Sequence, residues 1–407
     1  MNGLPEREEL LGAAGACGEW MLANQVDDHR FDANRGRGLS CFDLSTGGMY
    51  YTSGWLTGTM CMALLALHRR TGTERYLDAA ICAGHYIMSL QVMDSRDRRY
   101  YGAMREHTPQ SVEFCPRDAV TAAWALIWLY NSTQDPAYLD RVALFGHWHL
   151  RECMRNGWPL YMCFMDDSLM DVYRKGSFQS GVALFFHDLF MASGESLFIE
   201  RGMQPIVRAY RDDFFEDDGS IIQTRDRFTN QVLDIDDQQA RRGMHFYNDD
   251  FGNAALQCAA DSFGDESYRE AALRNARWLA GRQDDDGGFG DCHSAVPVSS
   301  MYFHDLGMFY NDRALLTARD RAAHKLLSMQ VRGVGEPRID GAFRGAYASP
   351  KKLPEGGKGL CVNMRTTSYA VMALLKLESD LTEIWLGRHN KRFSDRIPDP
   401  LEDYLHW

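Results

Sequence analysis

The stretch EFCPRDAVTAAWALIWLYNSTQDPAYLDRVALFGHWHL, residues 113–150, contains the unit from which the fold can be predicted. A polar and aromatic start leads into a run that is apolar on every side. A short turn at residues 134–138 then joins it to an amphipathic run. A helix that is apolar all round is buried, whereas an amphipathic helix covers the outside of a core. We therefore expect an inner helix followed by an outer helix.

The same unit recurs about six times along the chain. Polar clusters at residues 50–55, 113–118, 173–177, 246–250 and 363–367 precede apolar runs, and a further apolar run covers residues 298–310. Four amphipathic runs end near a glutamine, at Gln25, Gln91, Gln283 and Gln330. Repeated supersecondary units stack into one continuous core. Six helix pairs that close on themselves form an all-α (α/α)6 toroid, with its long loops at the N-termini of the inner helices. We expect one toroid domain over residues 1–382 and a C-terminal extension, residues 383–407, packed on it.

Composition narrows the possible functions. The 407 residues are 45% hydrophobic and carry a net charge of −12, which allows a large core and disfavours binding to nucleic acid or to an anionic membrane surface. The first residues lack the basic and apolar pattern of a signal peptide, and no apolar run approaches the roughly 20 residues of a membrane span. The ten cysteines are scattered without a CxxC pair, as is typical of reduced thiols in a cytoplasmic protein.

Three short motifs resemble those of a known superfamily. They are the W-x-x-G start of an inner helix (Trp55 and Gly58), the T-G-x-x-R-Y turn at residues 71–76, and the DGGFG loop at residues 286–290. They are similar to motifs of the six-hairpin toroid enzymes, which include unsaturated glucuronyl hydrolases, other glycosidases, polysaccharide lyases and sugar epimerases. The resemblance implies a carbohydrate-active enzyme, but motifs of the hairpin repeat do not name a reaction.

A second resemblance concerns the terpene-cyclase and prenyltransferase toroids. Residues 283–289, QDDDGGF, are similar to the glutamine-containing repeat of those proteins, and residues 234–237, DIDD, match the DxDD string of proton-initiated terpene cyclases. This alternative implies that Asp236 is the proton donor, or that Asp234, Asp236 and Asp237 hold a diphosphate through Mg²⁺.

Carboxyl groups that could perform glycoside chemistry lie in the loops before the inner helices. A glycosidase needs two of them, one on each side of the scissile bond. One cluster, residues 244–250, supplies His245, Tyr247, Asn248, Asp249 and Asp250. The second carboxyl group would come from another repeat, with Glu113, Asp118, Asp166 and Asp167 as candidates. Helix caps and solvated turns use the same residue types, so that alternative stays open for each of them.

Basic and aromatic residues recur in the same loops. Arg117, Arg174 and Arg365 carry planar guanidinium groups that suit a carboxylate, such as that of a uronic acid. Tyr51 and Trp55 present rings on which the apolar face of a sugar can stack. We therefore expect these five residues and Asn248 to bind the substrate.

We expect a glycoside hydrolase that acts on small oligosaccharides, including ones with uronic acid, by carboxyl acid–base catalysis. A uronate lyase or C5-epimerase is an alternative, in which Tyr247 or His245 abstracts the C5 proton. A non-catalytic scaffold that binds a partner at the toroid mouth is another. Cys292, His293 and His304 lack a fourth ligand at the spacing of a metal site, so we expect no metal. We expect no cofactor except Mg²⁺ under the diphosphate alternative.

Overall fold

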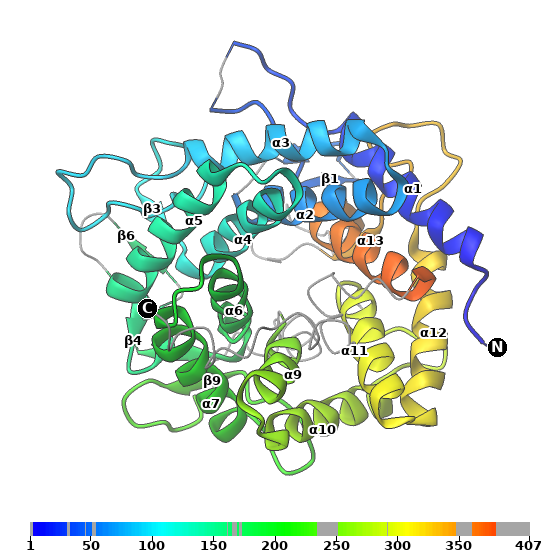
Figure 1. Cartoon of the computed structure of the whole chain (residues 1–407). Helices are drawn as coiled ribbons and strands as arrows, with labels where there is room; N and C mark the ends of the chain where they lie inside the picture. The colour runs from blue at the N-terminus through cyan, green and yellow to red at the C-terminus, as the bar shows by residue number, and fades with distance from the viewer. Residues whose placement is uncertain are drawn as a thin grey trace.

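The computed structural model describes residues 3–30, 33–44, 46–50, 54–160, 162–164, 169–170, 173–233, 251–290, 292–346 and 360–379. Within these residues the helices form two concentric rings (Figure 1). The inner ring consists of α2 (Gly54–Thr71), α4 (Pro116–Thr133), α6 (Val182–Ser193), α9 (Gly252–Phe263), α11 (Ala295–Tyr310) and α13 (Met364–Ser379). The outer ring consists of α1 (Arg7–Ala23), α3 (Glu74–Ser89), α5 (Pro136–Trp148), α7 (Gln204–Asp213), α10 (Glu266–Arg282) and α12 (Arg313–Met329). This is the (α/α)6 toroid predicted from the sequence.

Burial separates the two rings as the hydrophobic patterns predict. In α13 every residue from Met364 to Glu378 is buried, and in α2 every residue from Leu56 to Leu67 is buried. In α3, by contrast, the buried residues are those of one face, among them Tyr76, Ala83 and Ile87. A helix surrounded by other helices has no face for water, whereas an outer helix keeps one. The core is therefore the space between and inside the rings.

The ends of the chain close the ring. The inner helix α13 packs against α2 and also against α1, so the last inner helix pairs with the first outer helix. Glu378 on α13 reinforces this closure: its carboxylate accepts hydrogen bonds from Nε and Nη2 of Arg70, at 2.8 and 2.7 Å, and one from Arg7 at 3.2 Å. The Glu378 side chain is only 2% exposed. The first, second and last helices are thus joined through one buried carboxylate.

The glutamines that mark the sequence repeat have a common structural role. Each side-chain amide donates to the carbonyl of a loop glycine and to a carbonyl of the next outer helix, at distances between 2.8 and 3.1 Å. The four glycines have φ between 90° and 96°, in the left-handed region that favours glycine. A Cβ on any of them would overlap the backbone of the next outer helix. The pairs are Gln25 with Gly36, Gln91 with Gly102, Gln283 with Gly287, and Gln330 with Gly341.

Short strands occupy the loops before the inner helices. One sheet has the order β10 (Arg344–Ala346), β11 (Leu360–Asn363), β1 (Cys41–Asp43) and β2 (Met49–Tyr50), all antiparallel. A second contains β3 (Glu113–Phe114), β6 (Met162–Phe164) and β7 (Leu169–Met170). Two-stranded pairs are formed by β4 (Met154–Arg155) with β5 (Trp158–Pro159) and by β8 (Arg174–Gly176) with β9 (Thr224–Asp226). Because β3, β8 and β11 lead into inner helices, these strands frame one end of the toroid.

Two further observations complete the fold. Among the helices of the described residues, none combines the length and the apolar character needed to cross a membrane. The predicted C-terminal extension, residues 383–407, lies outside the described residues.

Candidate active site

Three inner helices begin side by side at the end of the toroid where the long loops lie. The helix α2 packs against both α4 and α13. The free N–H groups and the dipole make the start of each helix partly positive. This end of the ring therefore favours negatively charged side chains and ligands.

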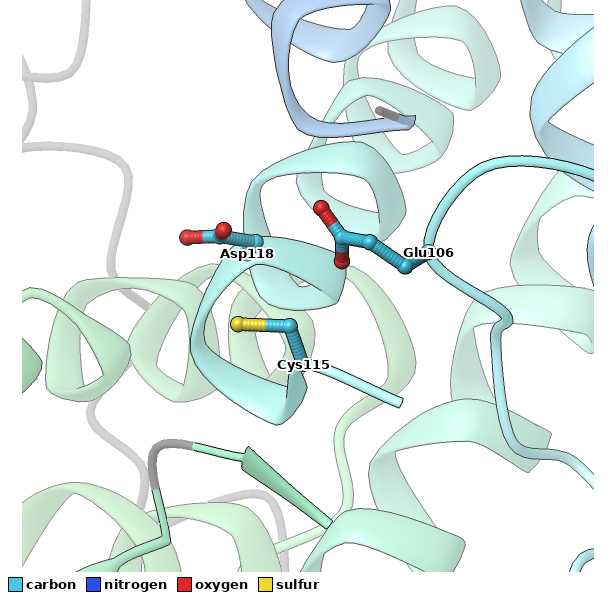
Figure 2. A group of neighbouring side chains, drawn as sticks. All are labelled: Glu106, Cys115 and Asp118. Carbon is cyan, nitrogen blue, oxygen red and sulfur yellow. The ribbon is translucent and has the colours of Figure 1, made fainter. Parts of the chain in front are cut away.

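Two carboxyl groups and a thiol meet at the start of α4 (Figure 2). Asp118 lies in the first turn of α4, Cys115 is its N-cap, and Pro116 occupies the first helical position, which needs no N–H donor. Glu106 comes from the preceding loop, and its own backbone carbonyl accepts a hydrogen bond from the Gly54 N–H at 2.9 Å. One carboxylate oxygen each of Glu106 and Asp118, and the Cys115 sulfur, lie within 4.8 Å of one another. Glu106 is 8% exposed and the Asp118 side chain 19%.

The Cys115 thiol is held in its neutral form. Burial raises the pKa of Cys115 well above its usual range, and the charges of Asp118 and Glu106 raise that pKa further. The thiol also hydrogen-bonds to the Asp118 carboxylate. A nucleophilic cysteine needs a lowered pKa, so this sulfur acts as a donor to Asp118 and not as a nucleophile.

Two guanidinium groups contact the indole of Trp55. Arg117, beside Asp118 on α4, has its guanidinium carbon 5.5 Å from the centre of the Trp55 ring, and Arg365, on α13, has its own at 5.6 Å. Both arginines are 7% exposed. Arg117 donates to Asp118 at 2.9 Å, and Arg365 also lies 5.8 Å from the Tyr369 ring centre. Trp55 Nε1 is buried and has no hydrogen-bond partner among the described residues. Three helix starts and the loop before α4 thus bring two cations, an indole and two carboxyl groups together.

An aromatic layer packs beside this cluster. Phe251, the N-cap of α9, has a φ of 79°, which is rare for an aromatic residue. Its ring makes edge contacts with Tyr369, at 5.3 Å between centroids, and with Trp124, at 6.0 Å. Trp124 in turn donates its indole hydrogen to Asp188 at 2.7 Å. Strained residues persist where packing holds them, and they concentrate at functional sites.

Several sequence candidates lie elsewhere or outside the described residues. Glu113 faces His107 at 3.6 Å with its side chain 43% exposed, and it is not part of the Glu106 cluster. Arg174 is exposed on β8. Residues not described are Tyr51, Asp166, Asp167, Asp234, Asp236, Asp237, His245, Tyr247, Asn248, Asp249 and Asp250. Sequence reasoning missed Glu106. The one signal was its position directly after the Gly-Ala-Met-Arg loop at residues 102–105.

The Glu106–Cys115–Asp118 group is, in the described part of the chain, the one set of three such side chains close enough to share a metal ion. It offers three donors, and a bound metal would have to remove the proton from a thiol whose pKa is raised. A carboxyl pair with a neutral thiol donor fits proton transfer better than metal binding.

The comparisons with known proteins concern the fold. No protein-family model matches the sequence, and no curated protein matches it. Among solved structures, an unsaturated glucuronyl hydrolase from Bacillus sp. GL1 is similar with a TM-score of 0.67 at 14% identity, over 93% of this chain and 99% of the other. Cellobiose 2-epimerase from Bacillus thermoamylovorans is similar with a TM-score of 0.65 at 12% identity, over 88% of this chain and 95% of the other. An alpha-1,6-mannanase variant from a Salegentibacter species is similar with a TM-score of 0.58 at 15% identity, over 91% of this chain and 98% of the other. The chain therefore has the six-hairpin (α/α)6 toroid fold.

Proposed function

We propose that the protein is a glycoside hydrolase for oligosaccharides that contain an acidic sugar. The observation that carries this proposal is the Glu106–Asp118 carboxyl pair, set beside Arg117 and Arg365 at the helix starts. The pair supplies a proton donor and an anion, the two groups that glycoside hydrolysis requires. The two guanidinium groups supply a site for the carboxylate of the substrate.

The two carboxyl groups have different surroundings, which suggests different roles. Asp118 receives hydrogen bonds from Arg117 and from the Cys115 thiol and lies in the first turn of α4, so its carboxylate is held in one orientation. We assign to Asp118 the attack on the anomeric carbon. Glu106 is the more buried of the two groups and comes from the loop before α4, outside the helix. We assign to Glu106 the protonation of the leaving oxygen, and then the activation of the water that releases the sugar from Asp118.

The separation of the carboxyl groups predicts the stereochemical outcome. Their nearest oxygens lie within 4.8 Å. This upper bound is shorter than the roughly 6.5–9.5 Å that inverting enzymes leave for a water molecule, and it is compatible with the closer pair of a retaining enzyme. We therefore propose retention of the anomeric configuration.

The similar structures support a carbohydrate substrate. The Bacillus sp. GL1 protein takes part in the degradation of glycosaminoglycan, a polymer with acidic sugars. The Salegentibacter mannanase is inactive when two consecutive aspartates are replaced. Two of the consecutive aspartate pairs in this chain, Asp166–Asp167 and Asp249–Asp250, precede inner helices in the sequence, and these remain our second proposal for the catalytic carboxyl groups.

Kinetics of matched variants test the assignment. We would measure the release of reducing ends from uronic-acid and neutral oligosaccharides by the wild type and by Asp118→Asn and Glu106→Gln. Asp94→Asn is the control, because Asp94 is an exposed carboxylate paired with Arg96. We expect both site variants to lose at least about 100-fold in kcat with the melting temperature of each close to that of wild type. Unchanged kcat in both, with loss in Asp249→Asn or Asp167→Asn, would move the chemistry to those residues.

The products separate hydrolysis from its alternatives. A lyase forms an unsaturated uronate that absorbs ultraviolet light, and an epimerase releases no reducing end. Either product would make Tyr247 and His245 the first residues to test. A diphosphate turned over with Mg²⁺ would favour the isoprenoid alternative and make Asp234, Asp236 and Asp237 the first residues to mutate. Binding without any product would favour a scaffold.

A further inference from the structure

Two aromatic side chains stand exposed beside the start of α6. Tyr173 is 66% exposed and Phe228 is 62% exposed, the highest values for large hydrophobic residues in the described part of the chain. Their ring centroids lie 6.1 Å apart at an interplanar angle of 65°, so the two rings make an edge-to-face contact and form one patch. Tyr173 immediately precedes β8, which leads into α6, so the pair lies on the loop end of the toroid, as the candidate active site does.

The backbone below this patch is held rigidly. Arg227, directly before Phe228, is 5% exposed, and its guanidinium donates to four backbone carbonyls, those of Arg155, Trp158, Pro159 and Arg174, at 2.8–3.0 Å. Its own N–H donates to the Tyr173 carbonyl at 2.6 Å. These bonds fix the two aromatic residues relative to each other and to β5 and β8.

The turn that carries Phe228 is fixed from the other side as well. The Asp226 carboxylate accepts the N–H of Phe228 at 2.9 Å and the N–H and hydroxyl of Thr229 at 2.7 and 3.0 Å. Exposed aromatic rings on mobile loops lose conformational entropy when they bind a ligand, whereas rings on a fixed turn lose little. The arrangement is therefore preorganised for binding.

We propose that Tyr173 and Phe228 form an outer sugar-binding subsite, which holds units of the oligosaccharide beyond the bond that is cleaved. This proposal rests on the proposed function. The apolar C–H face of a sugar ring stacks on an exposed aromatic ring. Arg174, the next residue after Tyr173, is exposed and stands opposite Asp226 in the register of β8 and β9. The patch thus has the apolar surface on which the rings of an oligosaccharide can stack.

The test is binding as a function of chain length, measured by isothermal titration calorimetry. The probes are oligogalacturonates, hyaluronan oligosaccharides and cello-oligosaccharides of two to six sugar units. The variants are Tyr173→Ala, Phe228→Ala and the conservative Phe228→Tyr. The control is Met308→Ala, because Met308 is 58% exposed but lies near the C-terminal end of α11, at the opposite end of the toroid.

We expect each alanine variant to weaken binding of the longer acidic oligosaccharides by roughly 3- to 10-fold and to leave the shortest unchanged. Phe228→Tyr and Met308→Ala should bind like wild type. Equal binding by wild type and both alanine variants would overturn the subsite but leave the hydrolase proposal standing. A loss of affinity that is the same for all chain lengths would also overturn the subsite and leave the hydrolase proposal standing. The same conclusion would follow if the wild type formed dimers that dissociate in the alanine variants, because the patch would then join two copies of the chain. Wild-type protein that binds none of the probes would overturn the proposed function itself.

Discussion

The close approach of the loop glycines to the outer helices predicts the effect of adding one methyl group. In Gly341→Ala, a Cβ would lie 2.9 Å from the carbonyl carbon of Ala16 on α1, and closer still to its oxygen. The φ of 94° adds conformational strain, about 1–2 kcal/mol for a residue with a Cβ. Displacing α1 to relieve the overlap adds about 1–3 kcal/mol. We therefore expect the free energy of unfolding to fall by about 2–5 kcal/mol.

Gly72→Ala is the matched control. Gly72 also has a positive φ, 70°, but nothing lies within 4 Å of the position that its Cβ would take. This variant should lose only the strain, about 1–2 kcal/mol. Urea unfolding followed by circular dichroism at 222 nm compares the two variants with wild type. Equal losses in the two variants would refute the idea that the Gln–Gly contacts set the distance between the loops and the next outer helix.

Three further changes have definite expected outcomes. Glu378→Gln should lower the unfolding free energy by about 1–3 kcal/mol, because its ion pair with Arg70 closes the ring. Arg70 lowers the pKa of Glu378, so this contribution is present above the unfolded-state pKa and is lost as the pH falls through the lower folded-state value. Acid unfolding curves of wild type and variant should therefore converge. Iodoacetamide at pH 8 should label the half-buried Cys82 before Cys115, because the Cys115 thiol is buried and its pKa is raised; mass spectrometry measures the order of labelling. Early labelling of Cys115 would contradict its raised pKa. Arg365→Lys should weaken binding of uronic-acid oligosaccharides about 10-fold and leave neutral ones unchanged; an equal effect on both would argue against carboxylate binding.

Periodicity in the sequence was sufficient to predict the two rings. Inner helices are apolar all round because they have no solvent face, and this pattern can be seen in any one of them. The glutamine spacing breaks between Gln91 and Gln283, and the loop after α7 shows one reason. There Asn275 of the next outer helix donates to the carbonyl of Gly219, at 3.0 Å, in place of a glutamine from the preceding helix. The carbonyl of the loop glycine is thus bound by a side chain of the next outer helix and not by a glutamine that precedes the loop. The regular glutamine spacing is therefore lost, although the loop still packs against the next outer helix.

The candidate site could be predicted only in part. Asp118, Arg117, Arg365 and Trp55 are marked in the sequence by their positions at helix starts. That Arg117 and Arg365 contact the same indole depends on the ring closing between α13 and α2, which no local pattern specifies. Glu106 lies in a loop, and its backbone carbonyl accepts the N–H of Gly54 at the start of α2, a contact that no local sequence pattern specifies.

The most direct test of the proposed function is proton NMR of uronic-acid oligosaccharides during the first minutes of incubation with the protein. We expect the first reducing-end product to keep the anomeric configuration of the bond that was cleaved, and we expect no product with Asp118→Asn. Inversion would contradict the role of the closely spaced Glu106–Asp118 pair. Full activity of Asp118→Asn would contradict its catalytic role, and no cleavage of any oligosaccharide by wild type would contradict the proposal as a whole.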